Sequence, residues 1–418
     1  MLMKRDHKIG AGVCGERTSP VRVMFLAPSM TLAGPQRQLL YLAKGLDRAR
    51  FEPVLAILGD GQPENSYDYR GVFSRVFKLN IPSEGNFALG RIPWLALGAL
   101  RLLRILREER PEIVHAFLPV PSVMGALVSK LAGVPVFIVG RRSLSALPRR
   151  GSRILTWIDR FPFKLADAIL ANCAAIAKET AEVDGVAADE IHTIPNGVDL
   201  ETFSSGRDSA LRQELGFHDD DVVFGIVANF FACKGHGDFI EAARLIHREC
   251  ANSRFLIVGV DHGTLPQVRQ QICANGLADV IRIVPGTRMP QAYYRAMDAY
   301  ICSSQSEGMS NSVAEAMCSG LPVIATIAGG NPELIKHGET GFLAAVGEPE
   351  EMACLGRQLC TDQVLRESIG ARARASIEVR FPAVAMVRAH EKLYAELLGL
   401  SPNTMEGDFH RPSLAAIQ

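Results

Sequence analysis

The sequence lacks several features that would place it in a particular class of protein. None of its nine cysteines forms a CxxC pair, so we expect no zinc site, and dispersed thiols suit a reducing cytoplasm. No run of about 18 uncharged apolar residues is present, so no membrane span is expected. The first twenty residues lack the apolar core of a signal peptide. Basic and acidic residues balance at 45 each, which argues against a nucleic-acid binder.

The sequence has instead a repeated alternation of short apolar runs and helix-length amphipathic segments. A strand at 21–28, a helix at 35–47 and a strand at 51–58 open the first series, and a strand at 221–230 opens a second. This alternation predicts parallel strands with helices on both faces of each sheet. The fold class we expect is α/β, with two doubly wound, Rossmann-like domains that face a cleft.

The pattern also gives domain boundaries. We expect an N-terminal domain over 21–205, a polar linker near 204–221 and a C-terminal domain over 206–383. A further helix is expected over 384–400. Residues 1–20 and 401–418 read as poorly ordered extensions.

Two glutamates flank a small polar loop in "SSQSEGMSNSVAEAMCSG", which starts at Ser303. Ser312-x-x-Glu315 fits a capping box, in which Glu315 would bond back to the helix start. That interpretation leaves Glu307 unexplained. Alternatively, both carboxylates serve a ligand: the helix amides would accept a phosphate, Glu307 would face the cleft, and Glu315 would bond sugar hydroxyls.

The neighbouring residues complete a longer motif. The stretch 299–343 contains E-G-x-x-N-x-x-x-E-A-M-x-x-G-x-P-V-I-A-T-x-x-G-G-x-x-E, and it resembles the retaining nucleotide-sugar glycosyltransferases of family 4, or group 1, which have the GT-B fold. "PEIVHAF", "LAGVPVFI", "ADAILANC", "IPNGVDLETF" and "ANFFACKGHGDFIEA" fit the same family in order. The resemblance covers about residues 21–398, and it implies that the last helix crosses back to the first domain.

The resemblance implies roles for individual residues. Glu307 is similar to the glutamate that faces the donor sugar and stabilises charge at the reacting centre, and Glu315 to the one that binds the ribose. Lys234 is similar to the lysine that contacts the donor diphosphate. His115 matches a cleft-facing histidine and is our second catalytic candidate, although a histidine satisfied within the core is an equal alternative.

Further donor-binding candidates come from the loops at the strand ends. These are Gly34, Asn229, Gly308, Ser310, Asn311 and Ser312. A glycine at position 34 would let the backbone approach a phosphate, or would simply form a turn. The family usually has an arginine five or three residues before its lysine, and here Asn229 and Phe231 stand at those positions. Arg288 is a candidate replacement for this cation.

The implied function is transfer of a hexose from a nucleotide-diphosphate sugar to an acceptor hydroxyl with retained anomeric configuration. The acceptor would be a glycan or a lipid-linked glycan in cell-surface polysaccharide or glycolipid synthesis. No cofactor and no metal are expected. The alternative is a non-catalytic GT-B protein that binds a nucleotide sugar or a partner, and an epimerase of the same fold fits the motifs less well.

A basic amphipathic helix is expected near the N-terminal domain surface. In 94–110, Leu95, Ala99, Leu102 and Leu106 share one face and the arginines lie on another. This helix either packs on the domain with a solvated basic face, or lies on an anionic bilayer together with the basic cluster at 141–153. The expected location is therefore cytoplasmic, with or without peripheral contact with the inner face of the membrane.

Overall fold

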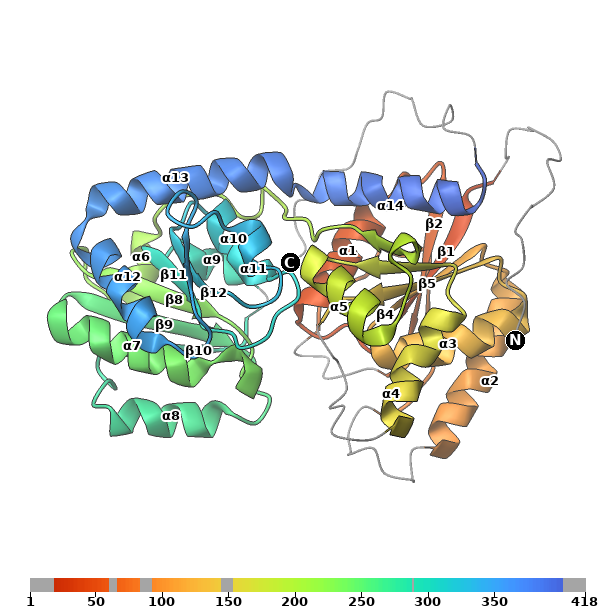
Figure 1. The fold of residues 1–418 in the computed structure, drawn as a ribbon, viewed down its shortest axis with the longest axis horizontal. Coiled ribbons are helices and arrows are strands. Elements are labelled where there is room, and N and C mark those ends of the chain that lie inside the picture. The colour runs from red at the N-terminus through yellow and green to blue at the C-terminus, as the bar shows by residue number, and fades with distance from the viewer. Residues whose placement is uncertain (1–18, 60–65, 83–91, 144–152, 288, 401–418) are drawn as a thin grey trace.

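The computed structural model describes residues 19–59, 66–82, 92–143, 153–287 and 289–400. Two α/β domains lie side by side, and the last two helices run along both of them (Figure 1). The first domain contains β1 (Val21–Ala27), α1 (Gly34–Gly45), β2 (Phe51–Ile57), β3 (Arg75–Lys78), α2 (Ile92–Glu109), β4 (Ile113–Phe117), α3 (Pro119–Ala132), β5 (Val136–Arg141), α4 (Arg153–Arg160), β6 (Ala168–Ala171), α5 (Ala174–Asp184) and β7 (Ile191–Thr193).

The second domain follows directly. It contains α6 (Ser209–Glu214), β8 (Val222–Val227), α7 (His236–Glu249), β9 (Ser253–Gly259), α8 (Leu265–Ala274), β10 (Ile281–Pro285), α9 (Pro290–Tyr294), β11 (Ala299–Cys302), α10 (Asn311–Cys318), β12 (Val323–Thr326), α11 (Asn331–Leu334), β13 (Phe342–Ala344), α12 (Pro349–Thr361) and α13 (Gln363–Arg380). The final helix, α14 (Ala383–Leu397), returns to the first domain.

Both sheets are parallel, which confirms the predicted fold class. In the described part of the chain, the first sheet has the order β3-β2-β1-β4-β5-β6-β7 and the second has the order β10-β9-β8-β11-β12-β13. The strand order reverses between β1 and β4 in the first sheet, and between β8 and β11 in the second. Ligands of doubly wound sheets bind outside the carboxyl ends of strands at such a switch point.

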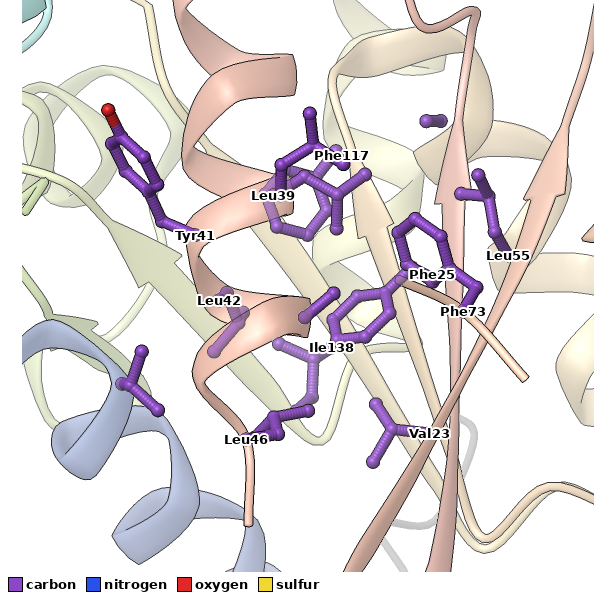
Figure 2. Packing of buried hydrophobic residues seen from close by; sticks show 14 of the residues in the cluster. Val23, Phe25, Leu39, Tyr41, Leu42, Leu46, Leu55, Phe73, Phe117 and Ile138 are labelled. Carbon is purple, nitrogen blue, oxygen red and sulfur yellow. The ribbon is translucent and has the colours of Figure 1, made fainter. Parts of the chain in front are cut away.

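Helix α1 shows how the apolar pattern produces the first domain. Pro35 stands in its first turn, where a missing N–H costs nothing. Leu39, Leu42 and Leu46 then recur on one face and are buried against Phe25 and its neighbours on the sheet, as Figure 2 shows. Each such side chain contributes about 1.5–3 kcal/mol to folding.

Helix α14 completes the same core from the far end of the chain. Its residues Val387, Leu393 and Tyr394 are buried in the hydrophobic cluster that contains α1 and β1. A Cβ built on Gly45 would lie 2.7 Å from Val387 Cγ2, so the absence of a side chain at position 45 lets the two helices touch. The helix therefore belongs structurally to the first domain.

One surface of the first domain is unexpectedly apolar. The predicted inner face of α2 is confirmed, since Leu102 and Leu106 are buried. Its outer face, however, exposes Trp94, Leu97 and Leu100 as well as arginines. Helices α3 and α4 pack beside it in turn (Figure 1). They expose Leu127, Leu131 and Trp157. None of the helices in the described residues is long and apolar enough to cross a membrane.

The segment predicted as a polar linker is not a simple connection. It contains α6, and Arg212 of that helix is completely buried in the second domain. Its guanidinium donates to the carboxylate of Asp298 at 2.9 Å and to the carbonyl oxygens of Ala296 at 2.9 Å and Asp221 at 2.7 Å. A single long polar side chain thus ties this segment to the sheet, which hydropathy alone does not reveal.

Replacing Arg212 with methionine should destabilise the second domain by about 3–5 kcal/mol, because Asp298 and the carbonyl groups lose a buried charged partner. Urea unfolding followed by circular dichroism measures this change. Arg207 is the matched control, since it lies 3.6 Å from the other oxygen of Asp298 but at the surface. Arg207→Met should cost less than about 1 kcal/mol. Equal losses in both variants would contradict the buried-pair explanation.

Candidate functional site

The switch points of the two sheets meet at the domain interface. The loop after β1 contains Leu32, and the loop after β8 contains Asn229. The amide nitrogen of the Asn229 side chain donates to the carbonyl oxygen of Leu32 at 3.1 Å. Its Oδ1 accepts from the backbone N–H of Val260 at 3.1 Å. Asn229 therefore joins the domains and carries no charge, although the family usually has an arginine there or at position 231.

Glu307 lies on the loop after β11 and is paired with Lys234. The Lys234 Nζ is 2.7 Å from Glu307 Oε1, and the hydroxyl of Ser304 donates to the same oxygen at 2.7 Å. Neither contact uses Oε2. Burial alone would lower the pKa of Lys234, but the Glu307 carboxylate outweighs it and holds the pKa above its ordinary value. Lys234 is therefore a firmly charged ammonium group.

Gly235 makes this pairing possible. Its φ is +67°, in the left-handed region, and a Cβ built there would lie 1.9 Å from the carbonyl oxygen of Ser303. Only glycine combines that conformation with such a close approach. The loop that contains Lys234 consequently lies directly against the C-terminal end of β11, where the loop that contains Glu307 begins.

Glu315 does not form the predicted capping box. Helix α10 begins at Asn311, its N-cap is Ser310, and no side chain caps it, so Glu315 stands too far along the helix. The carboxylate has stronger partners: Arg37 of α1 forms an ion pair with Oε1, and the Tyr294 hydroxyl donates to Oε2 at 3.0 Å. The Glu315 side chain is only 5% exposed. It thus forms a buried charge pair across the two domains.

The start of α10 contacts the first domain at several points. Asn311 Oδ1 accepts hydrogen bonds from Asn196 at 2.8 Å and from Gln38 at 3.1 Å. A Cβ built on Gly34 would lie 2.5 Å from Asn311 Nδ2. A side chain at position 34 would therefore displace the amide of Asn311, so the close approach made here is to a side chain of the other domain.

The remaining predicted residues at this helix start lie in the same layer. Ser310 and Ser312 have hydroxyl oxygens 3.3 Å apart. A Cβ built on Gly308 would lie 2.5 Å from the carbonyl oxygen of Arg142 in the first domain. The structure thus brings Gly34, Gly308, Ser310, Asn311 and Ser312 together around one helix start. Their contact with a donor stays a prediction.

His115 is enclosed by the first domain. Its ring has no solvent exposure, and Nδ1 is 2.8 Å from the Tyr394 hydroxyl of α14. It packs against Phe117, with ring centroids 4.5 Å apart, and against His390. Burial, and then the nearby His390 and Arg142, lower the pKa of His115 well below its usual value. The histidine is therefore a neutral core group here, and its catalytic role stays a prediction.

The sequence pattern did not predict several residues of the interface. Arg37, Gln38 and Asn196 lie in stretches that looked like ordinary helix or motif, and their partners are more than a hundred residues away. Glu333, the last residue of the long motif, accepts hydrogen bonds from the backbone N–H groups of Ala174 and Ala175 at the start of α5. The fixed glutamate in the motif was the only signal for this contact.

The chemistry available to this site is charge stabilisation. It combines one charged lysine, two carboxylates and the N-terminus of α10, which favours negative charge. The described residues contain no cluster of three or more histidine, cysteine, aspartate or glutamate side chains that could hold a metal ion. Arg288, the candidate replacement cation, lies outside the described residues.

Two family descriptions match the two domains separately. Residues 32–202 match "Glycosyltransferase Family 4", and residues 208–376 match "Glycosyl transferases group 1". Among curated relatives, the chain is 27% identical to the sulfoquinovosyl transferase SQD2 of Arabidopsis thaliana, over 86% of this chain and 71% of the relative. It is also 27% identical to N-acetyl-alpha-D-glucosaminyl L-malate synthase of Bacillus anthracis, over 72% and 78% of the two chains.

Solved structures agree in fold. HepE of Anabaena, in complex with UDP and glucose, superimposes with a TM-score of 0.78 at 23% identity over 90% of this chain and all of that chain. Sucrose-phosphate synthase of Thermosynechococcus elongatus gives 0.79 at 15% identity, over 91% of this chain. The two family matches together cover most of both domains, and the chain belongs to the group 1, family 4 glycosyltransferases of the GT-B fold.

Proposed function

We propose that this glycosyltransferase moves a hexose from a nucleotide-diphosphate sugar to an acceptor hydroxyl and retains the anomeric configuration. The observation that carries the proposal is the convergence of Lys234, Glu307 and Glu315 where the two switch points meet. The names of relatives specify donors of this kind. One Escherichia coli relative, 26% identical over 72% of this chain, is named as a galactosyltransferase that uses UDP-Gal.

Each side chain has a distinct task in this reaction. Lys234 and the N-terminus of α10 stabilise the leaving diphosphate, which gains charge as the glycosidic bond breaks. Lys234 and Ser304 both contact Oε1 of Glu307. The other oxygen, Oε2, stabilises the positive charge that develops on the sugar. Glu315 binds the ribose hydroxyls once the donor displaces or joins Arg37. Because these groups supply the charge, the reaction needs neither a resident metal nor a cofactor.

The acceptor we propose is a glycan or a lipid-linked glycan, in polysaccharide or glycolipid synthesis. The name of the Escherichia coli relative specifies a diphosphoundecaprenol-linked acceptor. The exposed side chains Trp94, Leu97, Leu100, Leu127, Leu131 and Trp157 form what we call the apolar surface of α2–α4. Exposed Arg104, Arg107, Lys130 and Lys164 lie on the same elements or just after α4. Such a surface suits peripheral binding to anionic lipid, on the cytoplasmic side.

A non-catalytic role in binding a nucleotide sugar is the second candidate. The observation that favours it is the neutral Asn229, which joins the two domains where the family resemblance leads us to expect a diphosphate-binding arginine. Release of nucleotide diphosphate from a panel of nucleotide sugars, with and without acceptor, separates the two. Binding without any release would support the second candidate.

Replacing Glu307 with glutamine should lower kcat by about two to three orders of magnitude, because the neutral amide no longer supports the sugar cation. Single-turnover transfer from the accepted donor measures this. The matched control is Glu241→Gln, which removes a carboxylate from the surface pair with Arg244 on α7. A native kcat in Glu307→Gln would contradict the proposal that Glu307 stabilises the sugar cation.

The ribose role of Glu315 can be tested on the ligand side. UDP, the nucleotide bound in HepE, should bind the native protein about tenfold more tightly than 2′,3′-dideoxy-UDP, because a hydrogen bond to a charged group is worth about 1.5–3 kcal/mol. Glu315→Gln should lose this preference, as measured by calorimetry. Arg37→Lys keeps a cation beside the Glu315 carboxylate and should keep the preference. An unchanged preference in Glu315→Gln would contradict the assignment.

Binding to lipid should depend on the apolar surface of α2–α4. The native protein should co-sediment with phosphatidylglycerol vesicles, more weakly at high salt, and the double variant Leu100→Ser, Trp157→Ser should bind roughly tenfold less well. Val364→Ser with Val379→Ser is the matched control, because both valines are well exposed on α13, on the other domain. Equal losses, or no binding by the native protein, would count against a membrane surface.

A further inference from the structure

A second arginine at the interface has an unusual environment. Arg142 directly follows β5, and its guanidinium lies over the ring of Phe117, 4.5 Å from the centroid. Its Nη1 donates to Asn196 Oδ1 at 3.0 Å. Its Nε is shielded from solvent and has no hydrogen-bond partner among the described residues. The side chain is held firmly but only partly satisfied.

Three other described cations in or near this interface face carboxylates. Arg37 pairs with Glu315, and Lys234 pairs with Glu307. Arg141, the neighbour of Arg142, lies 3.3 Å from Asp159 and 3.4 Å from Asp184. In the described ranges of the chain, no carboxylate lies within ion-pair distance of Arg142. Among the described residues, the hydrogen-bond partner of its side chain is the neutral Asn196.

The surroundings of Arg142 increase this imbalance. Burial lowers the pKa of Arg142 to about 10. Arg142 in turn helps to lower the pKa values of His115 and His390, both of which are buried with an unbonded Nε2. The nearby Tyr394 is neutral, since burial raises its pKa well above the usual value. A cation that is largely removed from solvent among neutral groups is costly unless an anion accompanies it, and Arg142 keeps only part of its surface exposed.

Arg142 also stands where a substrate phosphate would arrive. Its carbonyl oxygen contacts Gly308, the residue after Glu307. Its partner Asn196 donates to Asn311 Oδ1 at the start of α10. On its other side, a hollow at the ends of β4 and β5 is lined by polar and charged residues that include Ser122, Ser143, Arg142 itself and the ion pair of Arg141 with Asp159. An anion held by Arg142 would therefore lie between the first domain and the α10 N-terminus.

We propose that Arg142 binds a phosphoryl group of the substrate, and so supplies from the first domain the cation that Asn229 and Phe231 do not supply from the second. A guanidinium suits this task because it binds phosphate oxygens in a bidentate manner. The phosphoryl group comes either from the donor diphosphate or from a phosphorylated acceptor. This inference rests on the proposed function, since it names a substrate group for the same site.

Calorimetry on the full chain separates the two sources. In the donor arm, UDP is titrated into the native protein, Arg142→Gln and Arg142→Lys. In the acceptor arm, inorganic phosphate is titrated into the same proteins saturated with UDP. A donor contact predicts that Arg142→Gln weakens UDP binding roughly ten- to hundredfold, with Arg142→Lys closer to native. An acceptor contact predicts unchanged UDP binding and loss of phosphate binding. Arg70→Gln, at an exposed arginine, is the control.

Thermal unfolding shows whether Arg142 is only structural. Without ligand, Arg142→Gln should melt at or above the native temperature, because it removes an unpaired cation, and UDP or phosphate should no longer raise the melting temperature as it does for the native protein. Arg141→Gln should melt lower, since Asp159 and Asp184 each lose the buried cation that they share.

Three results would overturn the proposal. They are native affinities for both anions in Arg142→Gln, a loss of melting temperature in Arg142→Gln as large as in Arg141→Gln, and no binding of either anion by the native protein. A native protein that binds UDP through Arg142 but transfers no sugar would instead refute the proposed function and leave this inference standing.

Discussion

The buried ion pair between Arg37 and Glu315 is the interaction on which the arrangement of the two domains depends. A carboxylate with 5% of its side chain exposed is costly to bury without a charged partner, and the partner comes from the other domain. The pair therefore holds the start of α1 against α10, where a side chain at position 34 would meet the amide of Asn311. The hydrogen bonds of Gln38 and Asn196 to Asn311 reinforce the same contact.

This arrangement means that protein groups neutralise the charges of Glu307 and Glu315. Glu307 pairs with Lys234 within the second domain, and Glu315 pairs with Arg37 across the two domains. On the proposed function, a nucleotide sugar would bring two negative phosphates and two ribose hydroxyls to these side chains. Its binding would then exchange the ionic partners of Glu307 and Glu315, and domain movement offers a simple way to make that exchange.

The sequence predicted the architecture better than it predicted the contacts. Alternating apolar runs and amphipathic helices depend on local periodicity, so two parallel sheets and the strand-exit position of Glu307 followed from them. The partners of Glu315 did not follow, because Arg37 is 278 positions away in sequence and only tertiary packing brings it near. The capping-box prediction was wrong for the same reason. Glu315 forms an ion pair with Arg37 of the other domain instead of a local bond to the start of its own helix. Hydropathy also could not predict that Arg212, which lies in a polar segment, is buried.

The return of α14 to the first domain has a consequence for how the chain can be divided. Val387, Leu393 and Tyr394 fill part of the first domain's own core, although they lie beyond the whole second domain in sequence. Cutting the chain between the two sheets would leave the N-terminal half with an exposed apolar groove along α1. The N-terminal half is thus not an independent module. A recombinant of two relatives that exchanges the second domain must keep α14 from the same relative as the first domain.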